Sequence, residues 1–261
     1  MAETPHSIRY AITFGEVAIL HVGGQQIGNT RNRGFSCEDL ITLQHKLVAQ
    51  GLVCEYYSLH MSLPEEYRNN NQASVLILRQ GANFLLNKPN SADLLMQEQD
   101  SVPYDTKFFD RGQTKNKQAR HNIVFASEGQ EHSQDYRNPT IISFERVKLL
   151  FDIRSRLPIV FGSIASNLNA EGNKYHHKKS GIGFHGDSER KIVICLSLGK
   201  SMVLRYHWRL PGSSEHTFAP TDIILNHGDV YIMSEKATGW DWRKRSLVRV
   251  VHAAGYHANK C

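Results

Sequence analysis

The residues that could carry chemistry lie together in the C-terminal half of the chain. His185 and Asp187 are separated by one residue, inside the run Gly183-Phe184-His185-Gly186-Asp187. Side chains two positions apart in a β-strand point to the same face of the strand. We therefore predict that this imidazole and this carboxylate converge on one point and bind a metal ion.

A third ligand from another strand would complete such a site. Two histidines and one carboxylate bind Fe(II) on one side and leave other positions open for a cosubstrate and O₂. His252 stands in the apolar run Val250-Val251-His252-Ala253-Ala254, which is typical of a strand. The predicted iron ligands are therefore His185, Asp187 and His252.

The sequence around the first two ligands resembles the AlkB-like Fe(II)- and 2-oxoglutarate-dependent dioxygenases. Their pattern of Asn-x-Tyr, a short charged turn and Ile-Gly-x-His-x-Asp-x-Glu is matched from Asn173 and Tyr175 to Glu189. The resemblance covers roughly residues 160–255. It implies a double-stranded β-helix, Fe(II) as the metal, 2-oxoglutarate and O₂ as cosubstrates, and Asn173 and Tyr175 as residues that hold 2-oxoglutarate.

The distal part of the site departs from this pattern. AlkB-like proteins carry a histidine shortly after the Gly-Asp-Val strand, where this chain has Gly239-Trp240-Asp241-Trp242-Arg243. The run His-Ala-Ala-Gly at His252 is similar instead to the distal ligand segment of prolyl-hydroxylase-type enzymes. In those enzymes a lysine further along pairs with the cosubstrate carboxylate. Lys260 is the predicted equivalent, with Arg249 and Arg245 as alternatives.

Basic and aromatic side chains are interleaved near the predicted site, most densely in Trp240-Asp241-Trp242-Arg243-Lys244-Arg245. Basic groups bind phosphates and aromatic rings stack on bases, so this mixture suits a nucleic acid. Packing in the core would explain the tryptophans equally well. The predicted substrate contacts are Arg190, Tyr206, Trp240, Trp242, Arg243 and Arg245.

The leading hypothesis is thus an enzyme that hydroxylates or oxidatively demethylates a methylated nucleobase in DNA or RNA. The His-Ala-Ala-Gly segment and Lys260 favour an alternative, a hydroxylase of a protein side chain or a small molecule. The histidine that is missing from the usual distal position favours a third hypothesis, a catalytically silent barrel that binds nucleic acid.

Composition narrows these hypotheses only slightly. The 261 residues are 40% hydrophobic and 21% charged, as in ordinary soluble globular proteins. The 31 basic and 25 acidic residues give a weak indication of a polyanionic partner. Four cysteines without a Cys-x-x-Cys pair, no signal peptide and no long apolar run predict an intracellular protein, cytoplasmic or nuclear, without a membrane partner.

The elements expected to position the site form an α+β protein in two parts. Residues 1–95 show a β-α-β-α-β order, which predicts a small N-terminal α/β unit. Residues 96–261 are predicted to form the double-stranded β-helix (jelly-roll) domain. They begin with a polar stretch over 96–139, either a linker or functional loops, followed by a helix over 143–156 that Pro158 ends. Short apolar runs between turns then indicate a sandwich or barrel.

Overall fold

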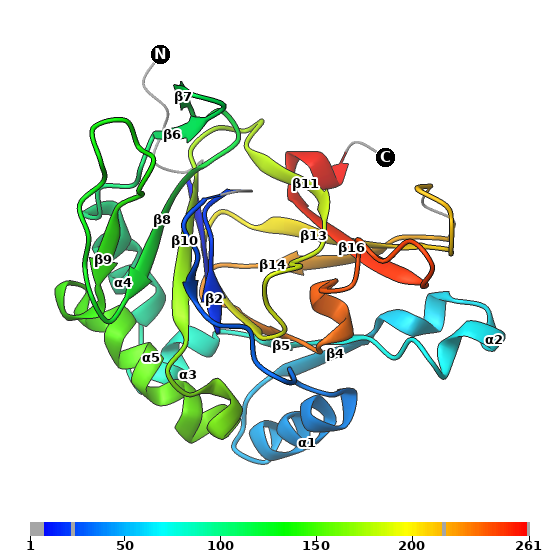
Figure 1. The fold of residues 1–261 in the computed structure, drawn as a ribbon. Coiled ribbons are helices and arrows are strands. Elements are labelled where there is room, and N and C mark those ends of the chain that lie inside the picture. The colour runs from blue at the N-terminus through cyan, green and yellow to red at the C-terminus, as the bar shows by residue number, and fades with distance from the viewer. Residues whose placement is uncertain (1–7, 22–23, 216–217, 260–261) are drawn as a thin grey trace.

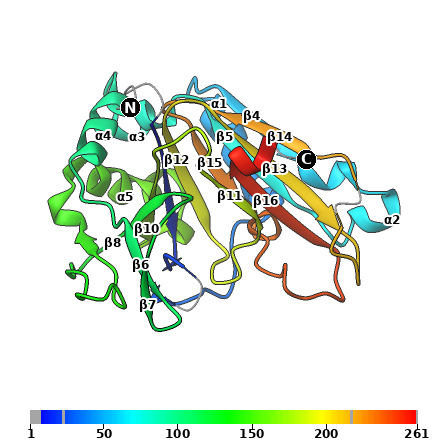
Figure 2. The ribbon, with the colours of Figure 1, turned by 90° about the horizontal axis from the view of Figure 1, so that it is seen from above.

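The computed structural model describes residues 8–21, 24–215 and 218–259. Two β-sheets face each other, and helices cover the outer side of the larger one (Figures 1 and 2). The chain is therefore a mixed α+β protein dominated by strands, as predicted. Among the described residues, no helix combines the length and the apolar character needed to cross a bilayer.

The larger sheet has eight strands, and all its neighbouring strands are antiparallel except the last two, which are parallel. The side chains of the sheet alternate between two apolar environments, the helices on one face and the smaller sheet on the other. The order is β4 (Cys54–Ser58), β5 (Ser74–Leu78), β15 (Val230–Met233), β12 (Val193–Gly199), β1 (Arg9–Gly15), β10 (Asn169–Tyr175), β8 (His121–Ala126) and β9 (Ile141–Ser143).

The smaller sheet is antiparallel, in the order β11 (Gly181–His185), β16 (Arg249–Gly255), β13 (Met202–Arg209) and β14 (Thr221–Leu225). The alternation along β13 explains why the smaller sheet packs against the larger one with a single face. Leu204, Tyr206 and Trp208 are buried toward the larger sheet, while the residues between them point outward. Short hairpins are formed by β2 (Val17–Ala18) with β3 (Ile27–Gly28) and by β6 (Lys107–Asp110) with β7 (Gln113–Asn116).

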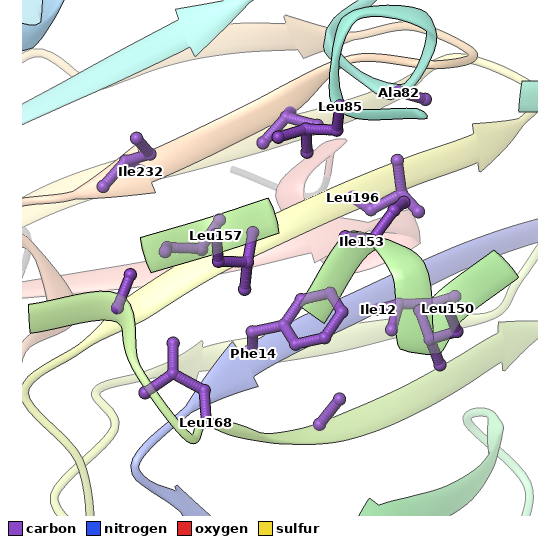
Figure 3. Packing of buried hydrophobic residues seen from close by; sticks show 14 of the residues in the cluster. Ile12, Phe14, Ala82, Leu85, Leu150, Ile153, Leu157, Leu168, Leu196 and Ile232 are labelled. Atoms are coloured by element: carbon purple, nitrogen blue, oxygen red, sulfur yellow. The ribbon is translucent and has the colours of Figure 1, made fainter. Parts of the chain in front are cut away.

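The helices are α1 (Cys37–Val48), α2 (Glu65–Arg68), α3 (Gly81–Leu86), α4 (Ser91–Asp100) and α5 (Lys148–Phe161). The helix predicted over 143–156 is divided into a 3-10 turn (Phe144–Arg146) and α5, which begins at Lys148 and continues past Pro158. A proline in the last turn removes only one backbone hydrogen bond, so the helix ends instead at Gly162, whose φ of 88° suits glycine. Figure 3 shows Leu150, Ile153 and Leu157 of this helix packed against Ile12 and Phe14 of β1.

Strands from both predicted parts of the chain share the larger sheet. β1 lies between β12 and β10, and β5 pairs with β15. The sheet therefore does not separate residues 1–95 from residues 96–261 as the sequence suggested. The apolar faces of β1, β4 and β5 are covered by the same helices that cover β10 and β12, so the early strands belong to the common core.

Candidate metal centre

The pairing of β11 with β16 brings the two histidines together. His185 ends β11 and stands opposite His252 in the register of the pair. An irregularity between Ile182 and His185 re-aims the end of β11. Asp187 lies just beyond the strand, in the turn that follows it, and not on the strand as predicted.

The three predicted ligands converge on one point. The Nε2 atom of His185 lies 3.5 Å from Oδ1 of Asp187, and Nε2 of His252 lies 4.0 Å from the same oxygen. One ligand atom from each residue lies within 4.8 Å of the others. Ligands around one ion at metal distances of roughly 2 Å are about 3 Å apart, so a small inward movement of these side chains suffices to enclose a metal.

The two histidines differ in the hydrogen bonds of their Nδ1 atoms. The Nδ1 atom of His185 lies 2.8 Å from the carbonyl oxygen of Gly183. When Nδ1–H donates to this carbonyl, the lone pair on Nε2 points toward Asp187 and is free for a metal. Nδ1 of His252 is buried and has no hydrogen-bond partner within the described part of the chain.

The protonation states suit a metal site. Burial alone would raise the pKa of Asp187, but Arg190 and the two histidines outweigh it and hold that pKa well below its usual range. Burial, helped by His185, lowers the pKa of His252 to about 3. At neutral pH the site therefore offers an ionised carboxylate and a neutral imidazole, which are the forms that bind metal.

The turn that carries Asp187 is held by a second segment of the chain. The backbone N–H of Asp187 donates to the carbonyl of Thr238 at 2.8 Å. Gly186 is packed so closely that a Cβ atom there would lie 2.3 Å from the carbonyl oxygen of Gly239 and 2.7 Å from the indole of Trp242. Only a glycine can be accommodated so close to Gly239 and Trp242, and this contact fixes the backbone position of the neighbouring Asp187.

A cavity of about 560 Å³ lies between the sheets, and the three ligands form part of its wall. Asn173 and Tyr175, the two residues singled out by the Asn-x-Tyr motif, stand two positions apart on β10 and both line this cavity. The Oδ1 atom of Asn173 accepts a hydrogen bond of 2.6 Å from Nε of Arg120, another residue of the wall. The side chains that would chelate a metal and those predicted to hold 2-oxoglutarate thus share one space.

Some of the predicted substrate contacts line the cavity and others do not. Trp242 and Arg243 line the cavity, with the Arg243 guanidinium 5.6 Å from the centre of the indole ring. Arg190 also lines it, but its guanidinium is buried in ion pairs with Glu171 at 2.7 Å and Glu189 at 2.8 Å.

The other predicted contacts lie elsewhere. Tyr206 is buried in the core between the sheets, its ring 5.6 Å from that of His252. Trp240 does not line this cavity, and the ammonium groups of Lys191 and Lys244 lie 4.7 Å and 4.2 Å from the centre of its ring. Arg245 is exposed and does not line the cavity either. Strand alternation on β13 decides the position of Tyr206, because every second side chain faces inward.

Arg249 is turned away from the cavity. It alternates with Val250 and His252 on β16, so its side chain lies on the opposite face of the sheet. There its guanidinium donates to the carbonyl oxygens of Leu210 at 3.1 Å and Ser213. Arg249 is therefore not placed to hold a cosubstrate, and Lys260, the other predicted partner, lies outside the described residues.

Glu171 and Arg120 are charged residues of the wall that were not predicted as parts of the site. Glu171 shares the inner face of β10 with Asn173 and Tyr175, and extending the same alternation by one step would have found it. Arg120 comes from the segment before β8, where no strand period indicates a direction. The Glu171–Arg190 pair lies behind Asp187, whose Oδ2 is 3.9 Å from Nε of Arg190.

No protein-family model matches the chain. The chain is similar over nearly its whole length to a viral protein, "Uncharacterized protein R156" of Acanthamoeba polyphaga mimivirus. The two are 37% identical over 246 residues, which is 94% of each chain. Identity of this extent shows common descent, and we conclude that the chain belongs to the same protein family as this mimivirus protein.

Proposed function

We propose that the protein is an Fe(II)- and 2-oxoglutarate-dependent dioxygenase. The observation that carries the proposal is the convergence of His185, Asp187 and His252, whose ligand atoms lie within 4.8 Å of one another in the wall of a cavity. Two imidazoles and one carboxylate are the ligand set of non-haem Fe(II) oxygenases.

The order of the strands supports a double-stranded β-helix as the fold. From β10 onward the chain alternates between the sheets: β10 lies in the larger, β11 in the smaller, β12 in the larger, β13 and β14 in the smaller, β15 in the larger and β16 in the smaller. Antiparallel strands that alternate between two facing sheets are the pattern of a jelly-roll. The candidate ligands His185 and His252 lie on β11 and β16 of the smaller sheet, and Asp187 follows β11 directly.

The roles of the protein groups follow from their positions. Bound Fe(II), with 2-oxoglutarate and O₂, would supply the oxidising chemistry. His185 and His252 would donate neutral nitrogens and Asp187 a carboxylate oxygen. Asn173 and Tyr175 would orient the 2-oxoglutarate along the wall. Apolar side chains of the inner sheet faces, including Leu204 and Val193, would exclude water from the reacting atoms.

We propose a methylated nucleobase as the substrate. Trp242 and Arg243 lie together in the cavity wall, and an indole beside a guanidinium suits a base and its phosphate. The Nε1 atom of Trp242 is buried and has no hydrogen-bond partner among the residues described, so it is a donor available to a ligand. The exposed Lys244, whose Nζ lies 4.2 Å from the centre of the Trp240 ring, adds a basic group in the same segment of the chain.

The test is turnover with defined substrates. Purified protein is incubated with Fe(II), 2-oxoglutarate, O₂ and a panel of methylated DNA and RNA oligonucleotides, and the products are weighed by mass spectrometry. We expect gain of an oxygen atom or loss of a methyl group, abolished by His252→Ala and retained by His45→Ala, a change at an exposed helix position.

The other outcomes identify the alternatives. Succinate formed with peptides or metabolites, and not with oligonucleotides, would replace the nucleobase with a protein side chain or a small molecule as substrate. Oligonucleotide binding without succinate formation on any substrate would contradict the enzyme and favour a silent binding barrel.

A further inference from the structure

Arg9 stands directly opposite Tyr175 where β1 pairs with β10. Directly opposed residues of antiparallel strands place their side chains on the same face of the sheet. Tyr175 lines the cavity, as do Ala11 and Thr13, the next residues of β1 in the same alternation. The Arg9 side chain therefore begins on the cavity face, beside the Tyr175 ring.

Among the residues that the structure describes, no carboxylate forms an ion pair with Arg9. Its Nε atom is buried and has no hydrogen-bond partner there. Burial lowers the pKa of the Arg9 guanidinium, and the neighbouring Tyr175 opposes this effect. A partly buried cation without a counter-ion is costly, so its position favours the binding of an anion.

Arg120 is a second cation in this wall of the cavity, and no carboxylate in the described part of the chain pairs with it. It lines the cavity, and its Nε donates to Oδ1 of the neutral Asn173 at 2.6 Å. Burial raises the pKa of Tyr175, while the positive charges of Arg120 and Arg9 both act to lower it. Arg190 differs, because Glu171 and Glu189 neutralise it.

We propose that Arg9 and Arg120, together with the Tyr175 hydroxyl, bind the carboxylate of 2-oxoglutarate that does not chelate the metal. The assignment rests on the proposed function. It moves the role predicted for Lys260 or Arg249 to the N-terminal strand, which lies between β12 and β10 in the middle of the larger sheet. Two guanidinium groups offer the paired donors that a carboxylate accepts.

The test compares two acids that share the 2-oxo acid group. 2-Oxoglutarate and 2-oxobutyrate, which lacks the second carboxylate, are titrated calorimetrically into metal-free protein and into protein loaded with Mn(II). We expect the wild type to prefer 2-oxoglutarate. Arg9→Met and Arg120→Met should each reduce the affinity for 2-oxoglutarate by about 10- to 100-fold, the value of a charge-assisted hydrogen bond, and leave 2-oxobutyrate binding unchanged.

Lys174→Met is the matched control. Lys174 precedes Tyr175 on β10 but points to the opposite face, where its Nζ lies 3.7 Å from Asp100 and 5.2 Å from the centre of the Tyr10 ring. The change Lys174→Met deletes one positive charge next to Tyr175 in the sequence but on the other face of the sheet. It should therefore not alter the preference for 2-oxoglutarate over 2-oxobutyrate. Arg9→Lys, which keeps the charge, should retain part of it and provides a variant that is expected to fold.

The proposal is overturned if neither protein form prefers 2-oxoglutarate, if both arginine variants bind it like the wild type, or if they weaken 2-oxobutyrate equally. Titration with Mn(II) alone distinguishes failure of this carboxylate-binding proposal from failure of the proposed function. Failure of the wild type to bind Mn(II) would contradict the metal centre, whereas the preference of the metal-free protein for the dicarboxylate is judged independently.

Discussion

The Nε2 atom of His252 lies 4.0 Å from Oδ1 of Asp187, although β12 to β15 separate the two residues along the chain. The contact exists because β11 and β16 are neighbours in the smaller sheet, with His185 opposite His252. The metal centre is therefore a product of long-range strand pairing, and its parts can be perturbed one at a time.

Removal of either Asp187 or His252 as a ligand should abolish tight metal binding. We expect Asp187→Asn and His252→Ala each to weaken Mn(II) binding by more than about 100-fold, because loss of even an outer-shell partner costs 10- to 100-fold. Calorimetry on the purified variants measures this effect, with His45→Ala as control. Unchanged affinity in His252→Ala would show that the third ligand is another residue.

Gly186 should tolerate no side chain. A Cβ atom there would meet the carbonyl of Gly239 at 2.3 Å, a backbone atom that cannot rotate away. We expect Gly186→Ala to lower the free energy of unfolding by about 1–3 kcal/mol, as overpacking does, and to weaken metal binding because Asp187 moves. Gly183→Ala is the control, since nothing lies within 4 Å of a Cβ at that position. Equal effects of the two changes on chemical denaturation would argue against this packing.

The buried pair of Glu171 and Arg190 should be coupled in stability. Removing one partner leaves the other charge buried, which typically costs about 3–5 kcal/mol. We expect a loss near the lower end for Glu171→Gln, because Glu189 still contacts Arg190 at 2.8 Å. The double variant Glu171→Gln/Arg190→Met should be less destabilised than the sum of the singles in urea unfolding. Simple additivity would mean that the ion pair contributes no coupling.

The stability of the metal-free protein should fall in acid. Burial and His185 lower the pKa of His252 to about 3, whereas an unfolded histidine titrates near 6.5. Between these values the unfolded state binds more protons, so the contribution of neutral His252 is complete above pH 6.5 and is lost as the pH falls toward 3. The slope from this residue is at most about 1.4 kcal/mol per pH unit.

Urea titrations of metal-free protein from pH 7 to pH 4 measure this dependence. His252→Gln removes the titrating group and should give a shallower fall than the wild type over the same range. A variant that loses stability as steeply as the wild type would assign the acid sensitivity to other groups.

Local patterns in the sequence were sufficient for several features. The spacing of His185 and Asp187 predicted two ligands close together, and the Asn-x-Tyr motif singled out Asn173 and Tyr175, which share one wall of the cavity. Ser36 followed by Glu38 and Asp39 is a typical helix start, and the structure shows a capping box between Ser36 and Asp39. These features depend on residues a few positions apart, whose relation is set by the period of a strand or a helix turn.

Other features depended on which distant segments pair, and the local period carries no information about that. Pairing in the tertiary structure alone placed β1 between β12 and β10 and brought Arg9 beside Tyr175. Each outcome follows from the register in which buried faces meet, because a shift of one residue would exchange the inner and outer side chains of a strand. The sequence alone determined the types of the ligands and their local spacing, and the packing of the two sheets decided which side chains share the cavity with them.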